Sequence, residues 1–285
     1  MVVPDRLHTV AVVGVGLIGG SVGLAARARG LAGRVVGVGH RQTSLDRALE
    51  RGAIDVATLD VREGVAEADL VVLATPVGLM APLVREAADA LRPDTVLTDV
   101  GSTKGRLACE LGPLTAGRCH YVGSHPMAGS EKRGVDEASA TLFEGALCFV
   151  TPTADSDPAV VAVLDCFWSA LGARVRHATP DQHDALVAGA SHLPHAVAAA
   201  LVNATPPAAL ACISTGFRDT TRVAAGDPRL WADVCLHNRD CLLEALAAFD
   251  GQIQTLRHLL QRGDEAELVA WLRAAKSVRD ESIPS

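Results

Sequence analysis

The stretch Val10-Ala-Val-Val-Gly14-Val-Gly16-Leu-Ile-Gly19-Gly20-Ser21 decides how the chain folds. Its first residues are apolar and mostly β-branched, which is typical of a buried strand. A G-x-G-x-x-G turn follows, and a helical pattern begins within it. Gly14 permits a tight turn, Gly16 lets the backbone approach a pyrophosphate, and Gly19 allows close helix–strand packing. The stretch predicts a dinucleotide site at a helix N-terminus, the alternative being glycines that serve packing alone.

Strands and helices alternate outward from this stretch. We expect strands at residues 9–14, 34–38, 70–74, 95–98, 121–123, 147–151 and 174–177, and helices at 18–29, 44–52, 78–91 and from Asp157-Pro158 onward. Strands that are apolar on both faces and separated by helices indicate a parallel sheet with right-handed crossovers. The fold class is therefore α/β, with a Rossmann-type doubly wound sheet at the N-terminus.

The strand signals stop after Pro180, and the rest of the chain is helical in pattern. The segment 181–203 is rich in Ala and Leu, and such helices commonly bury a face against a second copy of the chain. We therefore expect a dinucleotide-binding domain at 1–178 and an all-helical substrate and dimerisation domain at 179–285.

Composition limits the kinds of partner. The 285 residues suffice for about two domains, and the net charge of −7 with 3% aromatic residues argues against nucleic-acid binding. The 7 cysteines form no C-x-x-C pair, which indicates a reducing compartment, the cytoplasm. Residues 10–26 could pass as a signal peptide, but the glycine spacing explains them better. No other run approaches the ~20 apolar residues of a membrane helix, so we expect no membrane contact.

The residues after the second strand bear on the choice of cofactor. An NAD site usually carries an acidic residue there, yet none occurs between Gly14 and Asp46. Arg41 can pair with a 2′-phosphate or stack on adenine, unless it is a solvated loop residue. We expect NADP to be favoured and NAD to be possible. The residues that we assign to cofactor binding are Gly14, Gly16, Leu17, Ile18, Gly19, His40, Arg41, Thr43, Ser44, Thr75 and Pro76.

Polar residues gather in later segments, some of them directly after strands, where loops face the crevice of such a sheet. These segments are Thr98-Asp-Val-Gly-Ser102-Thr-Lys104, Gly123-Ser-His125-Pro-Met-Ala-Gly-Ser130-Glu131-Lys132, Ser191-His192-Leu-Pro-His195 and Gly216-Phe-Arg218-Asp-Thr-Thr-Arg222, followed by Trp231. With these motifs in this order, the chain closely resembles the prephenate/arogenate dehydrogenase family of tyrosine biosynthesis. The resemblance runs from the glycine turn to Trp231.

The resemblance implies an NAD(P)-dependent oxidoreductase that acts on a cyclohexadienol as a homodimer. Hydride leaves the ring carbon that carries the hydroxyl, the hydroxyl proton goes to a base, and the ring carboxylate departs as carbon dioxide. His125 matches the catalytic histidine, and a neutral imidazole near pH 7 suits a base. Ser102 matches the serine that hydrogen-bonds both the substrate hydroxyl and the histidine.

The resemblance also implies the substrate contacts. Arg222 matches the arginine that grips a carboxylate, the alternative being a surface salt bridge. His195 and His192 are both expected to contact the substrate, His195 near its side chain, and His192 is expected to be partly structural as well. Arg218, Ser130 and Glu131 are rim candidates, while Asp99 and Lys104 cap or brace their loop. His192 and His195 have no evident third ligand, so we expect no metal site.

Two other functions and a choice of substrate stay open. β-Hydroxyacid dehydrogenases resemble one another in using a lysine on the interdomain helix. The lysines here are 104, 132 and 276, so the helix expected at 181–203 contains none, which argues against that class. A non-catalytic NADP sensor would lose the polar crevice residues, but Ser102, His125, His195 and Arg222 are all present. His195 suits the keto group of prephenate and Glu131 the ammonium of arogenate, and we favour prephenate.

Overall fold

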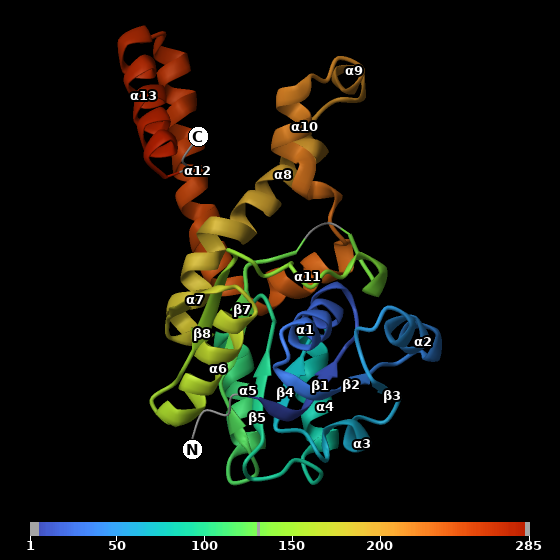
Figure 1. The fold of residues 1–285 in the computed structure, drawn as a ribbon. Coiled ribbons are helices and arrows are strands. Elements are labelled where there is room, and N and C mark those ends of the chain that lie inside the picture. Colours follow the sequence, from blue (N-terminus) through green and yellow to red (C-terminus); the bar gives the residue numbers. More distant parts are fainter. Residues whose placement is uncertain (1–5, 130–131, 283–285) are drawn as a thin grey trace. The chain divides into compact units, whose positions relative to one another are not determined.

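The N-terminal part of the chain is a parallel sheet. The computed structural model describes residues 6–129 and 132–282. This sheet has six strands in the order β3-β2-β1-β4-β5-β6, and Figure 1 labels the first five of them. Its strands are β1 (Leu7–Val13), β2 (Ala32–Val38), β3 (Val56–Thr58), β4 (Leu70–Leu73), β5 (Val96–Asp99) and β6 (His120–Tyr121). The order reverses direction between β1 and β4, and such switch points are where open α/β sheets bind ligands.

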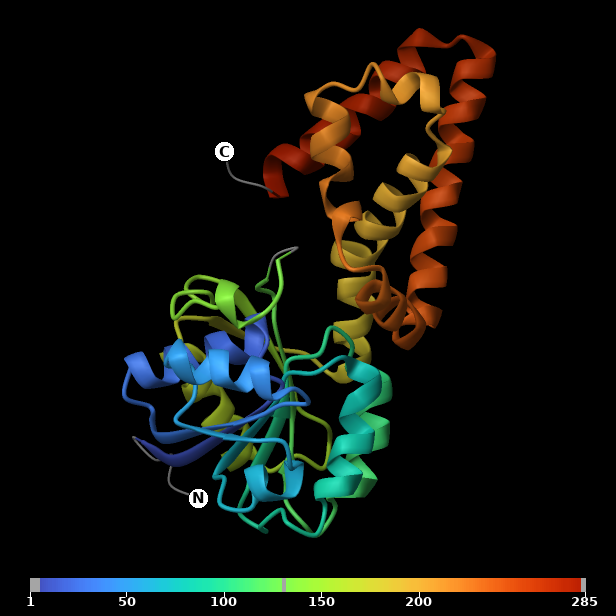
Figure 2. The ribbon, with the colours of Figure 1, turned by 90° about the vertical axis from the view of Figure 1, so that its right-hand side faces the viewer.

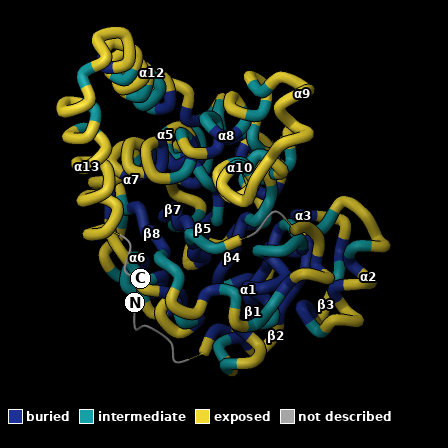
Figure 3. The backbone as a smooth tube through the Cα atoms, turned by 90° about the horizontal axis from the view of Figure 1, so that it is seen from above, coloured by how far each residue is buried: buried dark blue, intermediate teal, exposed yellow. Residues whose placement is uncertain are grey.

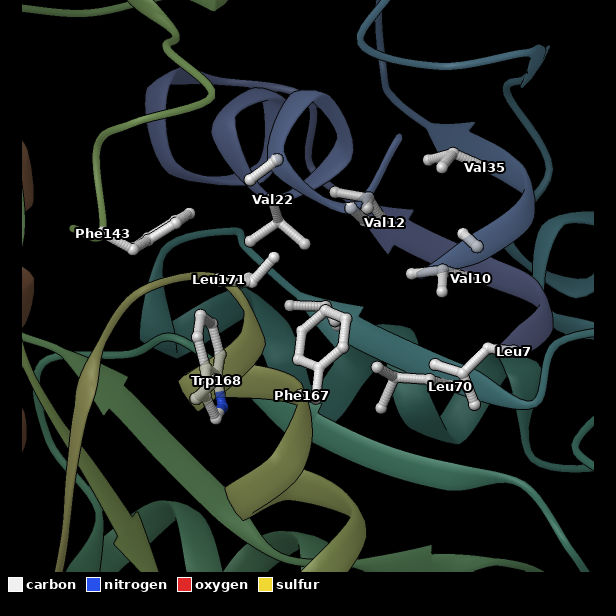
Figure 4. Close-up of a cluster of buried hydrophobic side chains, with 14 of the residues drawn as sticks. Leu7, Val10, Val12, Val22, Val35, Leu70, Phe143, Phe167, Trp168 and Leu171 are labelled. Carbon is white, nitrogen blue, oxygen red and sulfur yellow. The ribbon is translucent and has the colours of Figure 1, made fainter. Parts of the chain in front are cut away.

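Helices cover both faces of this sheet. On one face lie α1 (Leu17–Ala28), α2 (Gln42–Glu50) and α6 (Pro158–Ala170), and on the other α3 (Val61–Val65), α4 (Val77–Ala87) and α5 (Gly105–Thr115). Val10 and Val12 of β1 belong to the first layer and Ala11 and Val13 to the second, because successive strand residues point to opposite faces. Figure 4 shows the first layer, and Figure 2 shows α4 and α5 side by side. The doubly wound fold is confirmed.

A second, smaller sheet departs from the sequence expectation. The strands β7 (Gly123–Pro126), β8 (Leu147–Thr151) and β9 (Arg174–His177) form a three-stranded sheet in which β7 runs antiparallel to β8. The single parallel sheet was therefore wrong for these strands, and β3 was missed. The chain changes sheets after Tyr121, and a Cβ on Gly123 would lie 2.7 Å from Thr151 Oγ1, so only glycine fits this pairing.

The remainder of the chain is helical, as expected. Its elements are α7 (Pro180–Val187), a π-helical turn η2 (Ala188–His192), α8 (Leu193–Ala204), α9 (Pro207–Leu210), α10 (Thr215–Thr221), η3 (Arg222–Ala225), α11 (Pro228–His237), α12 (Arg239–Arg262) and α13 (Glu265–Ser282). By contacts, residues up to Arg239 form one compact unit and residues from Asp240 onward a second. The domain boundary at 178/179 stays a prediction.

The second unit is a pair of helices. Trp271 Nε1 of α13 donates a hydrogen bond to Gln252 Oε1 of α12 at 3.1 Å. Gly263, with φ of 64°, makes the turn between the two helices. Figure 3 shows that most of this pair is exposed.

The helical segment Pro180–Ala204 has 25 residues, and its most apolar 18 residues reach a mean hydropathy of 1.5, which is enough for a membrane span by length and composition. Ser191, His192 and His195 interrupt its apolar residues, so it is not a continuous apolar run. A single helix of this kind is weak evidence for a membrane span, because core helices of soluble proteins pass the same test.

Candidate active site

The glycine turn leaves the start of α1 open to a ligand. Gly14 has φ of 101°, and a Cβ there would lie 2.6 Å from the carbonyl oxygen of Ala74. A Cβ on Gly19 would lie 2.0 Å from the oxygen of Gly14, so helix and turn are in close contact. Gly16, the N-cap of α1, has no side-chain cap, and a Cβ there would meet nothing within 4 Å. Free N–H groups at an open helix N-terminus fit a pyrophosphate.

The other residues assigned to the cofactor lie around the same end of the sheet. Leu17 and Ile18 begin α1, and Thr75 and Pro76 join β4 to α4. His40, Arg41 and Thr43 are exposed and Ser44 is half-buried, all between the end of β2 and the first turn of α2. β2 and β4 both pair in parallel with β1, so the segments that follow these strands lie at the same edge of the sheet as the glycine turn.

His125 begins a chain of hydrogen bonds. It lies in β7 opposite Phe149, so the expectation that it occupies a loop was wrong. Its ring is buried, and its Nδ1 lies 2.8 Å from Nε2 of His183. Nδ1 of His183 lies 2.8 Å from Oδ1 of Asp184. His183 and Asp184 sit on α7, which thus supports the strand histidine at its Nδ1.

Asp184 fixes the direction of these hydrogen bonds. Its two carboxylate oxygens accept the backbone N–H groups of Lys104 at 2.7 Å and Gly105 at 2.8 Å, at the start of α5. A carboxylate there is also stabilised by the helix dipole. As Asp184 only accepts, His183 donates through Nδ1 and accepts through Nε2. His125 then donates through Nδ1, which leaves the lone pair of its Nε2 to take a proton.

The environment keeps these rings neutral. Burial lowers the pKa of His125 well below its usual value, and the nearby His183 and Lys104 lower it further. Burial also lowers the pKa of His183, although its hydrogen bond to Asp184 opposes that shift. A neutral imidazole is the form that acts as a base.

A buried ion pair braces the loop that carries Ser102. Lys104 Nζ pairs with Oδ1 of Asp99, and neither side chain is exposed. Asp99 Oδ1 also accepts the N–H of Gly101 at 2.7 Å, and Oδ2 accepts the hydroxyl of Tyr121 at 3.0 Å. Burial and the charge of Asp99 raise the pKa of Tyr121 well above its usual value, so the hydroxyl stays a donor. Half-buried Ser102 lies between these anchored residues.

The second histidine pair lies at the π-helical turn. Such a turn holds more residues than an α-helical one, so it changes which face the following residues occupy. His192 is buried, and Nδ2 of Asn238 lies 3.0 Å from its Nδ1. His195 stacks on Trp231 with ring centroids 3.4 Å apart and planes 14° apart. Burial lowers the pKa of His192 to about 4 and also lowers that of His195, so both rings are neutral.

The remaining expected residues are dispersed. Arg222 begins η3, which packs against α8, the helix of His195. Arg222 is exposed, and so is Arg218, which lies in α10. Ser130 and Glu131 lie outside the described residues. The roles assigned to all of these residues stay predictions.

The sequence reasoning missed His183, Asp184 and Asn238. The adjacent His183 and Asp184 at the start of an apolar helical segment were a usable signal. Burying a charged residue is costly unless it has a partner, so a titratable pair in such a segment suggests a specific role. Nothing local marks Asn238. It reaches the site only because the end of α11 packs beside α7 and η2.

A dinucleotide turn together with a buried histidine that is ready to accept a proton is the equipment of a nicotinamide-dependent dehydrogenase. Comparison with known proteins then gives the family. Residues 22–177 match the nucleotide-binding domain of prephenate dehydrogenase, and residues 179–274 match its dimerization domain. The chain belongs to the prephenate dehydrogenase family, as its motifs indicated.

Individual relatives cover nearly the whole chain. A prephenate dehydrogenase of Bacillus subtilis is 34% identical over 95% of this chain and 75% of its own length. The crystal structure of Aquifex aeolicus prephenate dehydrogenase with hydroxyphenyl propionate and NAD+ has a TM-score of 0.91, 33% identity and coverage of 97% and 98%. Synechocystis arogenate dehydrogenase has a TM-score of 0.83, 32% identity and coverage of 96% and 100%. The family thus includes enzymes named for both substrates.

Proposed function

We propose that this protein is a prephenate dehydrogenase that oxidatively decarboxylates prephenate to 4-hydroxyphenylpyruvate, with arogenate as the alternative substrate. The observation that carries the proposal is the arrangement of His125, His183 and Asp184. It leaves a neutral, buried imidazole with its Nε2 lone pair directed away from its hydrogen-bonded partner. Alcohol oxidation needs such a base for the hydroxyl proton.

Each residue of the site has a distinct task in this proposal. A nicotinamide cofactor held at the glycine turn of Gly14, Gly16 and Gly19 would supply the hydride acceptor. His125 takes the hydroxyl proton at Nε2, and Asp184 stabilises the resulting positive charge through His183. Ser102 hydrogen-bonds the hydroxyl and holds it in register with His125. Arg222 binds a substrate carboxylate as a bidentate partner, and His195, held against Trp231, contacts the substrate side chain.

The function is tested by comparing substrates. We expect the purified protein to reduce NAD(P)+ in the presence of prephenate, measured as nicotinamide absorbance, with a higher kcat/KM than for arogenate. A higher kcat/KM for arogenate would reverse the substrate assignment. Turnover of neither compound would remove the proposed function.

The cofactor preference is a second part of the proposal. NADP is favoured because exposed Arg41 precedes α2 where an acidic residue would repel a 2′-phosphate. Arg41→Ala should raise the KM for NADP by roughly tenfold to a hundredfold, the value of a charge-assisted hydrogen bond. The KM for NAD should hardly change.

A matched control for Arg41→Ala is Arg85→Ala, which removes an exposed arginine in the last turn of α4. This variant should leave both KM values as they are. If Arg41→Ala raises the KM for NADP and the KM for NAD equally, Arg41 only stacks on the adenine, and the NADP assignment is withdrawn.

The protein should be a homodimer. Large apolar side chains are exposed along the helical part of the first unit, at Leu201, Leu210, Ile213, Leu230 and Leu236. A second copy that covers such surfaces would remove them from water. Light scattering at micromolar concentration should therefore give twice the chain mass of 29.6 kDa, and a mass of one chain would refute the dimer.

The same proposal places the protein in the cytoplasm. The cysteines of the described residues are free, which suits a reducing compartment.

A further inference from the structure

Asn238 links the two histidine pairs of the site. It follows α11 and is 3% exposed. Its amide nitrogen Nδ2 lies 2.9 Å from the backbone oxygen of Asp184 and 3.0 Å from Nδ1 of His192. One buried amide therefore contacts both the helix that supports His125 and the ring of His192.

The contact with Asp184 determines which way the amide points. A backbone carbonyl only accepts hydrogen bonds, so the amide nitrogen of Asn238, and not its oxygen, has to face Asp184. The nitrogen carries a second hydrogen, and this one is directed at His192 Nδ1. Nδ1 must therefore be the acceptor of the ring. A neutral imidazole has one acceptor and one donor nitrogen, so the proton of His192 is on Nε2.

The Nε2–H group of His192 is a hydrogen-bond donor. Among the described residues this buried nitrogen has no hydrogen-bond partner. A buried donor without an acceptor is costly, and such groups in native proteins are usually satisfied by water or a ligand. Trp231 lies edge-on to the ring with centroids 6.2 Å apart, and it also holds His195, the residue assigned to the substrate side chain.

We propose that Asn238 is a positioning residue that holds His192 in its Nε2–H tautomer, so that the substrate contact expected of His192 is a hydrogen bond that its Nε2 donates to a carboxylate or carbonyl oxygen. This rests on the proposed function. The two buried histidines then have opposite roles. His125 donates through Nδ1 to His183 and keeps an acceptor at Nε2, whereas His192 accepts at Nδ1 from Asn238 and keeps a donor at Nε2.

The tautomer is measured directly by NMR. In the protein with ¹⁵N-labelled histidine, long-range ¹H–¹⁵N spectra distinguish a protonated from an unprotonated ring nitrogen, and the signals lost in His192→Gln identify His192. We expect a protonated Nε2 in the wild type and a mixture of both tautomers in Asn238→Leu. A proton on Nδ1 of His192 in the wild type would overturn the proposal.

Kinetics test the contact with substrate. His192→Gln retains an amide near the position of Nε2, and His192→Asn retains one near Nδ1. We expect the KM for prephenate to stay within about threefold of wild type in His192→Gln and to rise roughly tenfold or more in His192→Asn and Asn238→Leu. The KM for the cofactor should not change. Equal KM values in the two His192 variants would contradict the contact.

The outcomes separate this inference from the proposed function. If the wild type turns over neither prephenate nor arogenate, the proposed function fails and the substrate contact fails with it, while the spectrum still decides the tautomer. If Asn238→Leu does not fold, the comparison of His192→Gln with His192→Asn still decides the contact.

Discussion

Replacing His125 by asparagine should lower kcat by about 10²–10⁴-fold, the usual contribution of a positioned base. Asparagine cannot take a proton, yet its amide nitrogen can still donate to His183, so the surrounding structure should persist. Cofactor binding, measured by fluorescence titration, should be unchanged because the glycine turn belongs to another strand. Near-normal turnover in this variant would eliminate His125 as the base.

The pH profile of the wild type tests the same assignment. A base works in its deprotonated form, so kcat/KM should be high above the pKa of His125 and should fall as the pH drops through it. Because burial lowers that pKa well below the usual 6.5, the acid limb should lie well below pH 6.5. An acid limb above pH 6.5 would contradict a buried, neutral His125.

Lys104→Met should produce the largest loss of stability. It removes one partner of a fully buried ion pair and leaves the charge of Asp99 without its cation. Breaking a buried pair in this way costs about 3–5 kcal/mol. Urea unfolding at fixed protein concentration should show a loss of that order. The kcat should also fall, because the loop that holds Ser102 loses its brace.

Two variants serve as controls for Lys104→Met. Arg106→Met breaks the exposed pair between Arg106 and Glu110 two residues further on, and such pairs contribute at most about 1 kcal/mol. The double variant Lys104→Met with Asp99→Asn removes both charges and should recover part of the stability. If Lys104→Met is no more destabilising than Arg106→Met, the pair does not brace the loop.

The sequence predicted most elements of the first sheet, because their signals are local. Apolar runs mark the strands, and Asp157 before Pro158 marks the start of α6, where its side chain accepts the N–H of Ala159 at 2.8 Å. The division into two sheets was not predicted. Whether Gly123 pairs with the parallel sheet or antiparallel to Thr151 depends on a partner strand far along the chain.

The sequence by itself determined the glycine turn, the alternation of strands and helices, and the residue types available for catalysis. These depend on backbone sterics and on the period of apolar residues, which act over a few positions. Only the tertiary structure decided which ring nitrogen of His125 and of His192 carries the proton. The partners that decide it lie 58 residues apart for His125 and His183 and 46 apart for His192 and Asn238. A tautomer is set by the group that faces the ring, and no local pattern states which group that will be.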